Sequence, residues 1–349
     1  MFKALLFLII TNKNRKEKLM KILMFSIRND ELSWIKDWEQ DHPEISIKIC
    51  KDPLDEKTVD QTQGYDAVSL LQHNRISEEI LQKLSLNGVK IIALRTTGYE
   101  NIDFNLTEKY HLAVSNVAAY SPRAIAELVL TQSLRLVRHV GILEAQEKQG
   151  NFTWQGLEAL EIRQLTVGII GTGQIGMTVA KLFKALGAKI IGYDLYPRKN
   201  VSDILEYESL DTVIQKADIL TLHTQLTPET KGLINLQRLK EMKKTAFLIN
   251  MARGEIVNTA DLITALKNQE IAGAALDTIE GETGIFGEDL SSGYEAPLLK
   301  ELLSLPNVSI TPHVAFYTQP AVKNMIIISL NTCEQFLKGN KVENLVFPR

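Results

Sequence analysis

Residues 166–176 read Thr-Val-Gly-Ile-Ile-Gly-Thr-Gly-Gln-Ile-Gly, an apolar strand-like run that passes directly into a G-x-G-x-x-G turn. A helical pattern follows, and then a second apolar run that ends in Asp194, 18 residues after the last glycine. This order of strand, glycine turn, helix, strand and carboxylate is typical of a dinucleotide-binding βαβ unit. Gly171 permits the tight turn, Gly173 lets the backbone approach a pyrophosphate, and Gly176 allows the helix to pack closely on the strand.

The carboxylate at the end of the second strand favours one dinucleotide over the other. Asp194 would accept hydrogen bonds from the adenosine ribose hydroxyls and would repel a 2′-phosphate, so the sequence favours NAD over NADP. The pyrophosphate would meet the free N–H groups and the positive dipole end of the intervening helix. Arg198 stands four residues after Asp194, so its positive charge also bears on the choice between NAD and NADP.

Short β-rich apolar runs alternate along the chain with stretches of helical period, which predicts parallel α/β layers. Between two series of such strands, a long helix is predicted at 121–140, with Ser121 as N-cap and Pro122 in its first turn. The first series of predicted strands covers residues 22–25, 45–50, 67–71, 90–94 and 113–115, and the second covers 166–170, 189–193, 219–223, 246–250, 272–276 and 308–310.

Length and composition indicate an ordinary globular protein. At roughly 150 residues per domain, 349 residues predict about two domains. The net charge of -3 gives no basic excess that would indicate nucleic acid or an anionic membrane as a partner. Cys50 and Cys333 stand far apart, in no metal-ligand spacing, and are interpreted as reduced thiols. We therefore expect a cytoplasmic protein with a small-molecule partner and no metal site.

The first residues are treated separately because residues 4–10 form an apolar run of seven, followed by a polar, basic stretch. A membrane helix needs about 20 apolar residues, so this run is too short to span a bilayer. The stretch after it lacks the small-residue cleavage site of a signal peptide. We interpret residues 1–19 as an extension, with the folded pattern beginning at Met20.

Polar side chains follow several strands of the second series, where an open parallel sheet binds its ligand. Reduction of a 2-oxo acid by NADH needs a cation to polarise the carbonyl and an acid to protonate its oxygen. Arg253 is a candidate for the cation, and His313 and His223 are both candidates for the acid, since spacing alone does not choose between them. Glu282 beside a histidine would stabilise the protonated imidazole.

From residue 20 to near the C-terminus, the ordered motifs resemble those of the D-isomer-specific 2-hydroxyacid dehydrogenases, above all the D-lactate and D-2-hydroxyisocaproate enzymes. The motifs that carry the resemblance are Arg95-Thr96-Thr97-Gly98-Tyr99, Asn116-Val117-Ala118-Ala119-Tyr120-Ser121-Pro122, the glycine turn with Asp194, Asn250-Met251-Ala252-Arg253-Gly254, Asp277-Thr278-Ile279-Glu280-Gly281-Glu282 and Thr311-Pro312-His313-Val314-Ala315-Phe316.

The resemblance implies a Rossmann-type, doubly wound α/β cofactor domain inserted into a smaller, flavodoxin-like α/β substrate domain. The NAD-binding domain would cover residues 120–316, and the substrate domain would combine residues 20–119 with residues 317–349. The catalytic cleft would lie between them. The resemblance also implies a homodimer formed through the cofactor domains, with helix 121–140 as a contact helix.

The same resemblance assigns residue roles. It implies that His313 is the acid/base, that Glu282 is its partner and that Arg253 clamps the substrate carboxylate and carbonyl. The residues implied to contact NAD are Gly171, Gly173, Gln174, Ile175, Gly176, Asp194, Thr224, Gln225, Thr230, Met251, Ala252, Arg253 and Asp277. The residues implied to contact substrate are Leu71, Thr97, Gly98, Tyr120, Arg253 and Phe316.

The implied reaction is the NAD-dependent reduction of 2-oxo acids to D-2-hydroxy acids. Leu71 stands where some lactate enzymes of the family carry tyrosine, and the smaller side chain suits branched or aromatic acids as well as pyruvate. Two alternatives remain: a glycerate or phosphoglycerate dehydrogenase, and an NAD-sensing relative without activity. The complete set of Arg253, Glu282 and His313 speaks against the second alternative.

Overall fold

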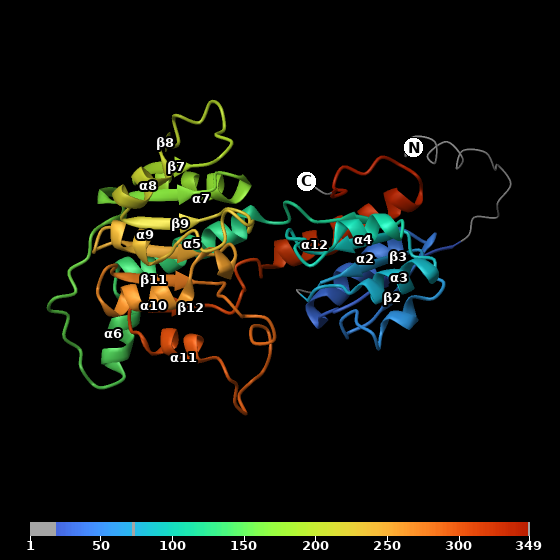
Figure 1. Ribbon diagram of the computed structural model, residues 1–349, viewed down its shortest axis with the longest axis horizontal. Coiled ribbons are helices and arrows are strands. Elements are labelled where there is room, and N and C mark those ends of the chain that lie inside the picture. Colours follow the sequence, from blue (N-terminus) through green and yellow to red (C-terminus); the bar gives the residue numbers. More distant parts are fainter. Residues whose placement is uncertain (1–18, 72–73, 348–349) are drawn as a thin grey trace. The chain divides into compact units, whose positions relative to one another are not determined.

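The structure is a computed structural model, and it describes residues 19–71 and 74–347. The apolar run at 4–10 and nearly all of the interpreted extension therefore lie outside the described residues. The chain forms two compact units, drawn in Figure 1. One runs from Ser121 to Tyr317, and the other combines the residues up to Tyr120 with those from Thr318 onward.

The unit from Ser121 to Tyr317 is built on a parallel sheet of seven strands in the order β12-β11-β10-β9-β6-β7-β8. The order reverses between β6 and β9, which is the topological switch point where doubly wound sheets bind ligands. The prediction of a Rossmann-type fold is confirmed. The strands are β6 (Thr166–Ile170), β7 (Lys189–Tyr193), β8 (Glu206–Tyr207), β9 (Ile219–Leu222), β10 (Phe247–Asn250), β11 (Gly273–Leu276) and β12 (Val308–Ile310).

Helices cover both faces of this sheet, which explains why its strands are continuous apolar runs. Val167 and Phe183 are buried in the core on one face, and Leu220 and Leu248 are buried in the core on the other. The first face is covered by α5 (Pro122–Val137) and α7 (Gln174–Ala185), and the second by α8 (Leu210–Lys216), α9 (Leu236–Glu241), α10 (Thr259–Lys267) and α11 (Pro297–Ser304).

The structure differs from the sequence analysis in one helix end and one strand. The helix predicted at 121–140 starts as expected, with the Ser121 side chain accepting the N–H of Ala124, but it ends at Val137. His139 adopts a left-handed conformation (φ +54°), which breaks the helix before α6 (Val140–Glu147) begins. Strand β8 was not predicted, because two residues are too few to show a period of two.

The second unit contains a parallel sheet of five strands in the order β2-β1-β3-β4-β5. This is the flavodoxin-like order, so the predicted fold class of this unit is also confirmed. The strands are β1 (Met20–Met24), β2 (Ile45–Ile49), β3 (Ala67–Leu70), β4 (Ile91–Leu94) and β5 (Ala113–Ser115).

Residues from both ends of the chain build this unit. Trp38 of the N-terminal segment and Leu330 of the C-terminal segment are buried in one core cluster. That face is covered by α2 (Leu32–Asp41) and α12 (Gln319–Leu337), and the opposite face by α3 (Glu78–Leu86) and α4 (Phe104–Lys109). Short 3-10 helices complete the chain: η1 (Asn29–Glu31), η2 (Val59–Thr62), η3 (Ile162–Gln164) and η4 (Gly254–Ile256).

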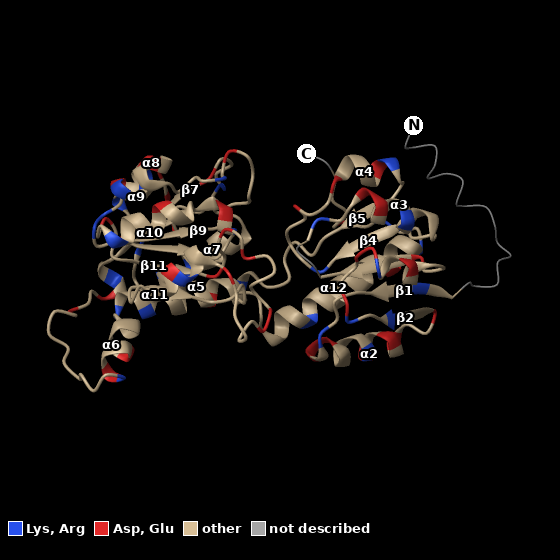
Figure 2. Cartoon of the chain, turned by 60° about the horizontal axis from the view of Figure 1, so that its bottom comes forward, with Lys and Arg blue, Asp and Glu red and all other residues tan. Residues whose placement is uncertain are grey.

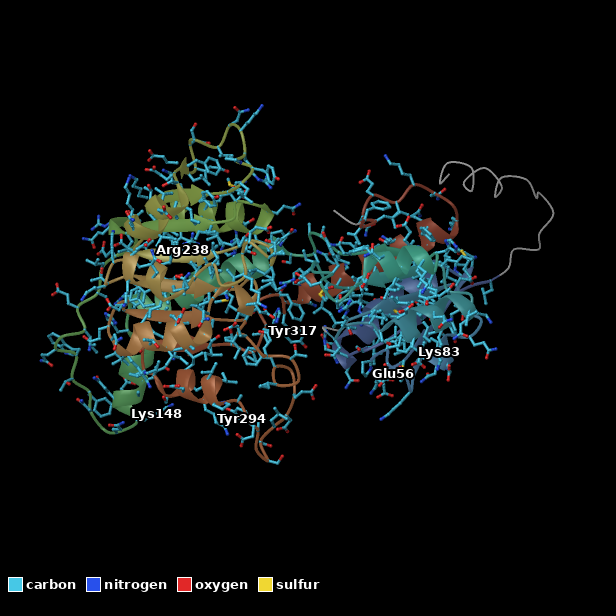
Figure 3. All side chains as sticks on the ribbon, in the orientation of Figure 1. Glu56, Lys83, Lys148, Arg238, Tyr294 and Tyr317 are labelled. Carbon is cyan, nitrogen blue, oxygen red and sulfur yellow. The ribbon has the colours of Figure 1, made fainter. Side chains whose placement is uncertain are left out.

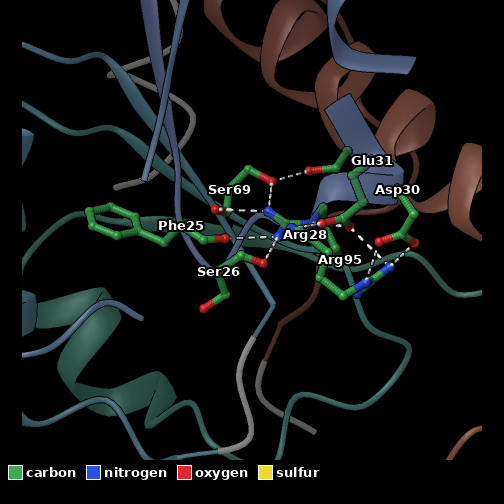
Figure 4. Close-up of polar contacts among 8 residues, drawn as sticks. Phe25, Ser26, Arg28, Asp30, Glu31, Ser69 and Arg95 are labelled. Carbon is green, nitrogen blue, oxygen red and sulfur yellow. Dashed lines mark hydrogen bonds and ion pairs between the residues drawn. The ribbon is translucent and has the colours of Figure 1, made fainter. Parts of the chain in front are cut away.

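A buried cation ties together the strand ends of this sheet (Figure 4). Arg95 follows β4 and is fully buried; its Nη1 donates to the Ser69 carbonyl (3.1 Å) and its Nη2 to the Phe25 carbonyl (2.8 Å). Glu31, also buried, places Oε1 3.6 Å from the Arg95 Nε. Burial lowers the pKa of Arg95 to about 10, which still leaves it charged at neutral pH. The guanidinium thus fixes three strand ends beside the segment that starts at Thr96.

Charged side chains of both signs are intermingled along both units (Figure 2). No stretch of one sign dominates either sheet, in keeping with the nearly balanced composition. Within residues 19–71 and 74–347, none of the helices combines the length and the apolar character needed to cross a membrane.

Candidate active site

The glycine turn after β6 has the geometry of a phosphate cradle. A Cβ at Gly171 would lie 2.6 Å from the His223 carbonyl carbon, and a Cβ at Gly176 would lie 2.0 Å from the Gly171 oxygen. Both positions therefore require glycine for the turn to close. A Cβ at Gly173 would meet no described atom within 4 Å, so open space faces the N-cap of α7. Gln174 and Ile175 form the first turn of that helix, whose free N–H groups and dipole suit an anion.

The acidic residue predicted for the ribose lies beside this turn. Asp194 follows β7, and its Oδ2 accepts the backbone N–H (2.6 Å) and the side-chain hydroxyl (3.0 Å) of Thr172. Its Oδ1 accepts the N–H of Tyr196 (2.9 Å). The carboxylate is therefore held at the carboxyl end of β7, beside the glycine turn. The residues of this turn fit NAD.

The loop after β9 borders the glycine turn across the switch point. The Cβ position at Gly171 lies 2.7 Å from the Thr224 nitrogen, so the two backbones are in close contact. The Thr230 hydroxyl donates to the Gln225 carbonyl (2.7 Å) and fixes the shape of this loop. Thr224, Gln225 and Thr230 are therefore brought together on one loop next to the turn.

The arginine loop after β10 is held by its own asparagine. Asn250 Oδ1 accepts the N–H of Ala252 (3.1 Å), and Asn250 Nδ2 donates to the Arg253 carbonyl (2.8 Å). A Cβ at Gly254 would lie 2.1 Å from the Ile279 carbonyl carbon. Only glycine allows this approach, so the arginine loop packs directly on the segment that leads to the predicted glutamate.

Glu282 and His313 are 31 residues apart in the sequence and form a close pair in the structure. Glu282 Oε1 lies 2.5 Å from His313 Nδ1, and Glu282 Oε2 accepts the N–H of Ile279 (2.8 Å). A carboxylate only accepts hydrogen bonds, so Nδ1 carries the proton that points at Glu282. Nε2 is then the ring nitrogen suited to exchange a proton with a substrate.

Asp277 organises the turn that carries the histidine. Its buried carboxylate accepts the Thr311 hydroxyl (2.6 Å), the Val314 N–H (2.9 Å) and the Ala315 N–H (2.8 Å). His313 adopts φ +54°, a left-handed conformation that costs about 1–2 kcal/mol for a residue with a Cβ. The hydrogen bonds to Asp277 offset this strain and set the direction of the imidazole.

The structure separates the two candidate histidines. His223 places Nε2 2.9 Å from the Thr221 hydroxyl, and its Nδ1 is buried with no hydrogen-bond partner among the described residues. Burial lowers the pKa of His223 to about 3, so its imidazole is neutral at pH 7 and unsuited to donate a proton. His313 instead has Nδ1 2.5 Å from the Glu282 carboxylate, so its ring is held in one orientation.

In the other unit, the segment after β4 presents two backbone donors. The Thr96 hydroxyl donates to the Gly98 carbonyl (2.7 Å), and Asn116 Nδ2 donates to the Thr97 carbonyl (2.6 Å). The amide N–H groups of Thr97 and Gly98 have no acceptor within residues 19–71 and 74–347. Adjacent amide donors of this kind suit a carboxylate.

The remaining predicted residues have the following environments. Leu71 is half-buried directly after β3, and the Tyr120 carbonyl accepts from Asn324 Nδ2 (2.7 Å). Phe316 stacks edge-to-face on Tyr317, which is labelled in Figure 3, with ring centroids 5.9 Å apart. The Met251 side chain is buried in the core beneath α5 and α7, so any contact with cofactor would come from its backbone.

Sequence reasoning assigned no role to Asn250 and Gly254, although both position the arginine loop. Asn116 was likewise unassigned, yet it fixes the Thr97 carbonyl. All three lie inside the motifs that carried the resemblance, and this was the only signal available for them. Their roles depend on contacts with segments far away in the chain.

Three successive strands, β10, β11 and β12, end in the segments that carry the guanidinium, the carboxylate and the imidazole, at the edge of the sheet that holds the dinucleotide turn. Hydride transfer between a nicotinamide and a polarised carbonyl needs this combination. The fold and the site thus define an NAD-dependent dehydrogenase.

Comparison with known proteins gives the family. Residues 130–315 match the model of the "D-isomer specific 2-hydroxyacid dehydrogenase, NAD binding domain". The chain is 40% identical over 331 residues to a D-2-hydroxyacid dehydrogenase (NAD(+)) of Clostridioides difficile, covering 94% of this chain and 100% of that protein. It is 38% identical to an aromatic 2-oxoacid reductase of Clostridium sporogenes, covering 92% of this chain and 97% of that protein.

A solved structure agrees with these sequences. The crystal structure of D-lactate dehydrogenase with NAD+ from Lactobacillus jensenii is similar with a TM-score of 0.85 and 40% identity, covering 94% of this chain and 100% of that one. The chain belongs to the D-isomer specific 2-hydroxyacid dehydrogenases. It is an NAD-dependent oxidoreductase that interconverts 2-oxo acids and D-2-hydroxy acids, as the sequence predicted, which sets aside the alternative of a relative without activity.

Proposed function

We propose that this enzyme reduces a 2-oxo acid with His313 as general acid, Glu282 as its partner and Arg253 as the clamp on the substrate. The observation that carries the proposal is the 2.5 Å contact between His313 Nδ1 and Glu282 Oε1. It supports a ring orientation in which Nε2 delivers the proton. Bound NADH supplies the hydride that forms the new C–H bond at C2.

The proton and charge balance of the step follows from these groups. Arg253 attracts electron density onto the carbonyl oxygen, which lowers the barrier to attack at C2. The proton on His313 Nε2 passes to that oxygen and leaves a neutral imidazole, which regains a proton from solvent. The products are the 2-hydroxy acid and NAD+. In the oxidation direction, neutral His313 removes the hydroxyl proton.

The substrate carboxylate is assigned to the amide N–H groups of Thr97 and Gly98. The supporting observation is that these amides have no acceptor among the described residues, while the carbonyls beside them are already bonded. Tyr120, Phe316 and Leu71 are proposed to border the rest of the substrate, as the family resemblance implies.

The cofactor is proposed to lie along the glycine turn and Asp194. In the proposed arrangement, the pyrophosphate binds the first turn of α7, and the ribose diol binds Asp194. Open space at Gly173 supports the first assignment, and the fixed carboxylate supports the second. The remaining contacts are proposed for Gln174, Ile175, Thr224, Gln225, Thr230, Met251, Ala252 and Asp277.

We further propose that the substrate range extends beyond pyruvate. Leucine at position 71 leaves more room than the tyrosine found in some lactate enzymes, and it offers an apolar wall. A steady-state panel of pyruvate, 2-oxoisocaproate, phenylpyruvate and hydroxypyruvate tests this proposal. We expect kcat/KM for the branched and aromatic acids to equal or exceed that for pyruvate. A preference for pyruvate over both would contradict the broad pocket, and a preference for hydroxypyruvate would favour the glycerate alternative.

The variant Leu71→Tyr provides a matched test of the same pocket. It should reduce kcat/KM for 2-oxoisocaproate by about tenfold, since one poorly fitting apolar group is worth about 1–3 kcal/mol, while pyruvate is less affected. Equal losses for both acids would show that the position does not contact the side chain of the substrate.

A cytoplasmic homodimer is the assembly we propose. The segment after Lys148, labelled in Figure 3, carries Phe152, Trp154 and Leu160, which are 76%, 72% and 52% exposed. Three large apolar side chains within nine residues suit contact with a second copy. Sedimentation of the wild type should give a dimer, and Trp154→Asp should favour the monomer, whereas Leu303→Asp, at an exposed side chain of α11, should not.

Two free, buried cysteines support a reducing, cytoplasmic compartment.

A further inference from the structure

A hydrogen-bonded chain connects β8 to the carboxylate of Asp194. The Tyr207 hydroxyl, on β8, lies 2.7 Å from the Thr172 hydroxyl, which in turn donates to Asp194 Oδ2 (3.0 Å). The backbone N–H of Arg198 donates to the Tyr207 hydroxyl (2.9 Å). Four residues from three strand ends and one exposed loop are therefore joined in a single chain of hydrogen bonds.

The direction of every bond in this chain is determined. A carboxylate has only acceptors, so Thr172 donates its hydroxyl proton to Asp194. The Thr172 oxygen is then left to accept, and Tyr207 must be its donor. The Tyr207 oxygen accepts the Arg198 N–H, which has only a donor to offer. Because all donors point the same way, the bonds polarise one another and strengthen the chain.

The chain fixes which part of Asp194 can meet a ligand. Oδ2 already accepts two hydrogen bonds from Thr172, so Oδ1 is the oxygen with capacity for a ribose hydroxyl. The same chain holds the backbone of Arg198, the exposed cation that could bind a 2′-phosphate if the loop moved toward it. The hydrogen-bonded chain therefore acts on both groups, Asp194 and Arg198, that decide between a 2′-hydroxyl and a 2′-phosphate.

We propose that Tyr207 is a positioning residue for cofactor selectivity, whose hydroxyl holds Asp194 and the Arg198 loop in the arrangement that admits NAD and rejects NADP. This inference rests on the proposed binding of the adenosine ribose at Asp194. The Tyr207 ring packs against the core beneath α7, so removal of the hydroxyl alone leaves the packing in place.

The test is the affinity of Tyr207→Phe for NADH and NADPH, measured by nicotinamide fluorescence without substrate. We expect the Kd for NADH to rise about three- to tenfold, the loss expected for one hydrogen bond to a charged network, with no matching loss for NADPH. The ratio of the Kd for NADPH to the Kd for NADH, which measures the preference for NADH, therefore falls. An equal loss for both cofactors, or no change for either, would overturn the proposal.

Further variants keep the outcome interpretable. Thr172→Val should lower the ratio as Tyr207→Phe does, and Thr172→Ser should retain it. Tyr294→Phe, a change at a half-buried tyrosine of the same unit, should leave both Kd values unchanged. Asp194→Ala tests the ribose site itself. If its NADH affinity does not change, the proposed cofactor position is wrong. If Asp194→Ala binds NADH weakly while Tyr207→Phe binds both cofactors normally, only the proposed role of Tyr207 is overturned.

Discussion

His313 Nδ1 lies 2.5 Å from Glu282 Oε1, and the other oxygen of Glu282 is bonded to the backbone N–H of Ile279. The glutamate therefore has little freedom to turn away from the ring. It holds the proton on Nδ1 and so leaves Nε2 to face the substrate. The rate of reduction should therefore depend on this contact.

The variant Glu282→Gln should lower kcat for reduction by about 10- to 100-fold, within the usual range for general acid catalysis. A neutral amide accepts the Nδ1 proton less strongly than a carboxylate, so the ring is held less firmly in the orientation that directs Nε2 at the substrate. Glu288→Gln, on the exposed loop that follows, should leave kcat unchanged, and native kcat in Glu282→Gln would contradict the role of the pair.

Asp277→Asn tests the turn behind the histidine. The native carboxylate accepts three hydrogen bonds. The NH2 group of an asparagine would place a donor against one of these donors, so that hydrogen bond would be lost. We expect a loss of about 2–4 kcal/mol in the free energy of unfolding and a fall in kcat as the ring loses its direction. Denaturant unfolding and steady-state kinetics check both. If Asp277→Asn retains native stability and native kcat, the turn does not depend on the Asp277 carboxylate.

Two glycines of the cofactor turn should respond differently to the same methyl group. Gly176→Ala places a Cβ 2.0 Å from a carbonyl oxygen, so we expect about 1–3 kcal/mol of destabilisation or more. Gly173→Ala meets open space, so the fold should be retained while NADH binds about tenfold more weakly, because the methyl group occupies the path of the pyrophosphate. Thermal unfolding and NADH fluorescence separate the two effects, and unaltered NADH affinity in Gly173→Ala would place the phosphate elsewhere.

His223, whose Nδ1 is buried without a hydrogen-bond partner among the described residues, should make stability depend on pH. Its folded pKa of about 3 lies below the ordinary value of 6.5, so between these values the unfolded chain binds the extra proton. Stability is retained above pH 6.5 and is lost as the pH falls below it. From pH 7.5 to 5, the wild type should lose about 2 kcal/mol relative to His223→Asn. Exposed His111→Asn is the control, and equal pH dependence in wild type and His223→Asn would contradict the burial argument.

The sequence predicted most of the fold because parallel strands buried on both faces are continuous apolar runs. Ten of its eleven predicted strands begin and end within one residue of the observed ones, and β1 begins two residues earlier than predicted. Strand β8 was not predicted, because two residues are too few to show an alternation of polar and apolar side chains. The end of α5 was not predicted, because the left-handed conformation of His139 has no signal in the sequence.

The candidate site was less accessible to sequence reasoning. Spacing identified His223 and His313 equally, and they are separated by contacts that depend on the whole fold: His313 lies against Glu282, whereas His223 Nδ1 is buried with no hydrogen-bond partner among the described residues. Asn250, Gly254 and Tyr207 act through segments distant in the chain, so their contacts have no signature in a single sequence. The glycine turn and Asp194 were predictable because the βαβ unit is local.

The central claim is that His313 is the general acid of 2-oxo acid reduction, and the measurement that tests it most directly is turnover by His313→Gln alongside its NADH affinity. The account predicts a fall in turnover of about 10²–10⁴-fold, the contribution of general acid catalysis, with NADH affinity close to that of the wild type. The wild type should form only the D-2-hydroxy acid by chiral analysis. Turnover that survives the substitution, or a loss of activity explained by lost NADH binding, would contradict it.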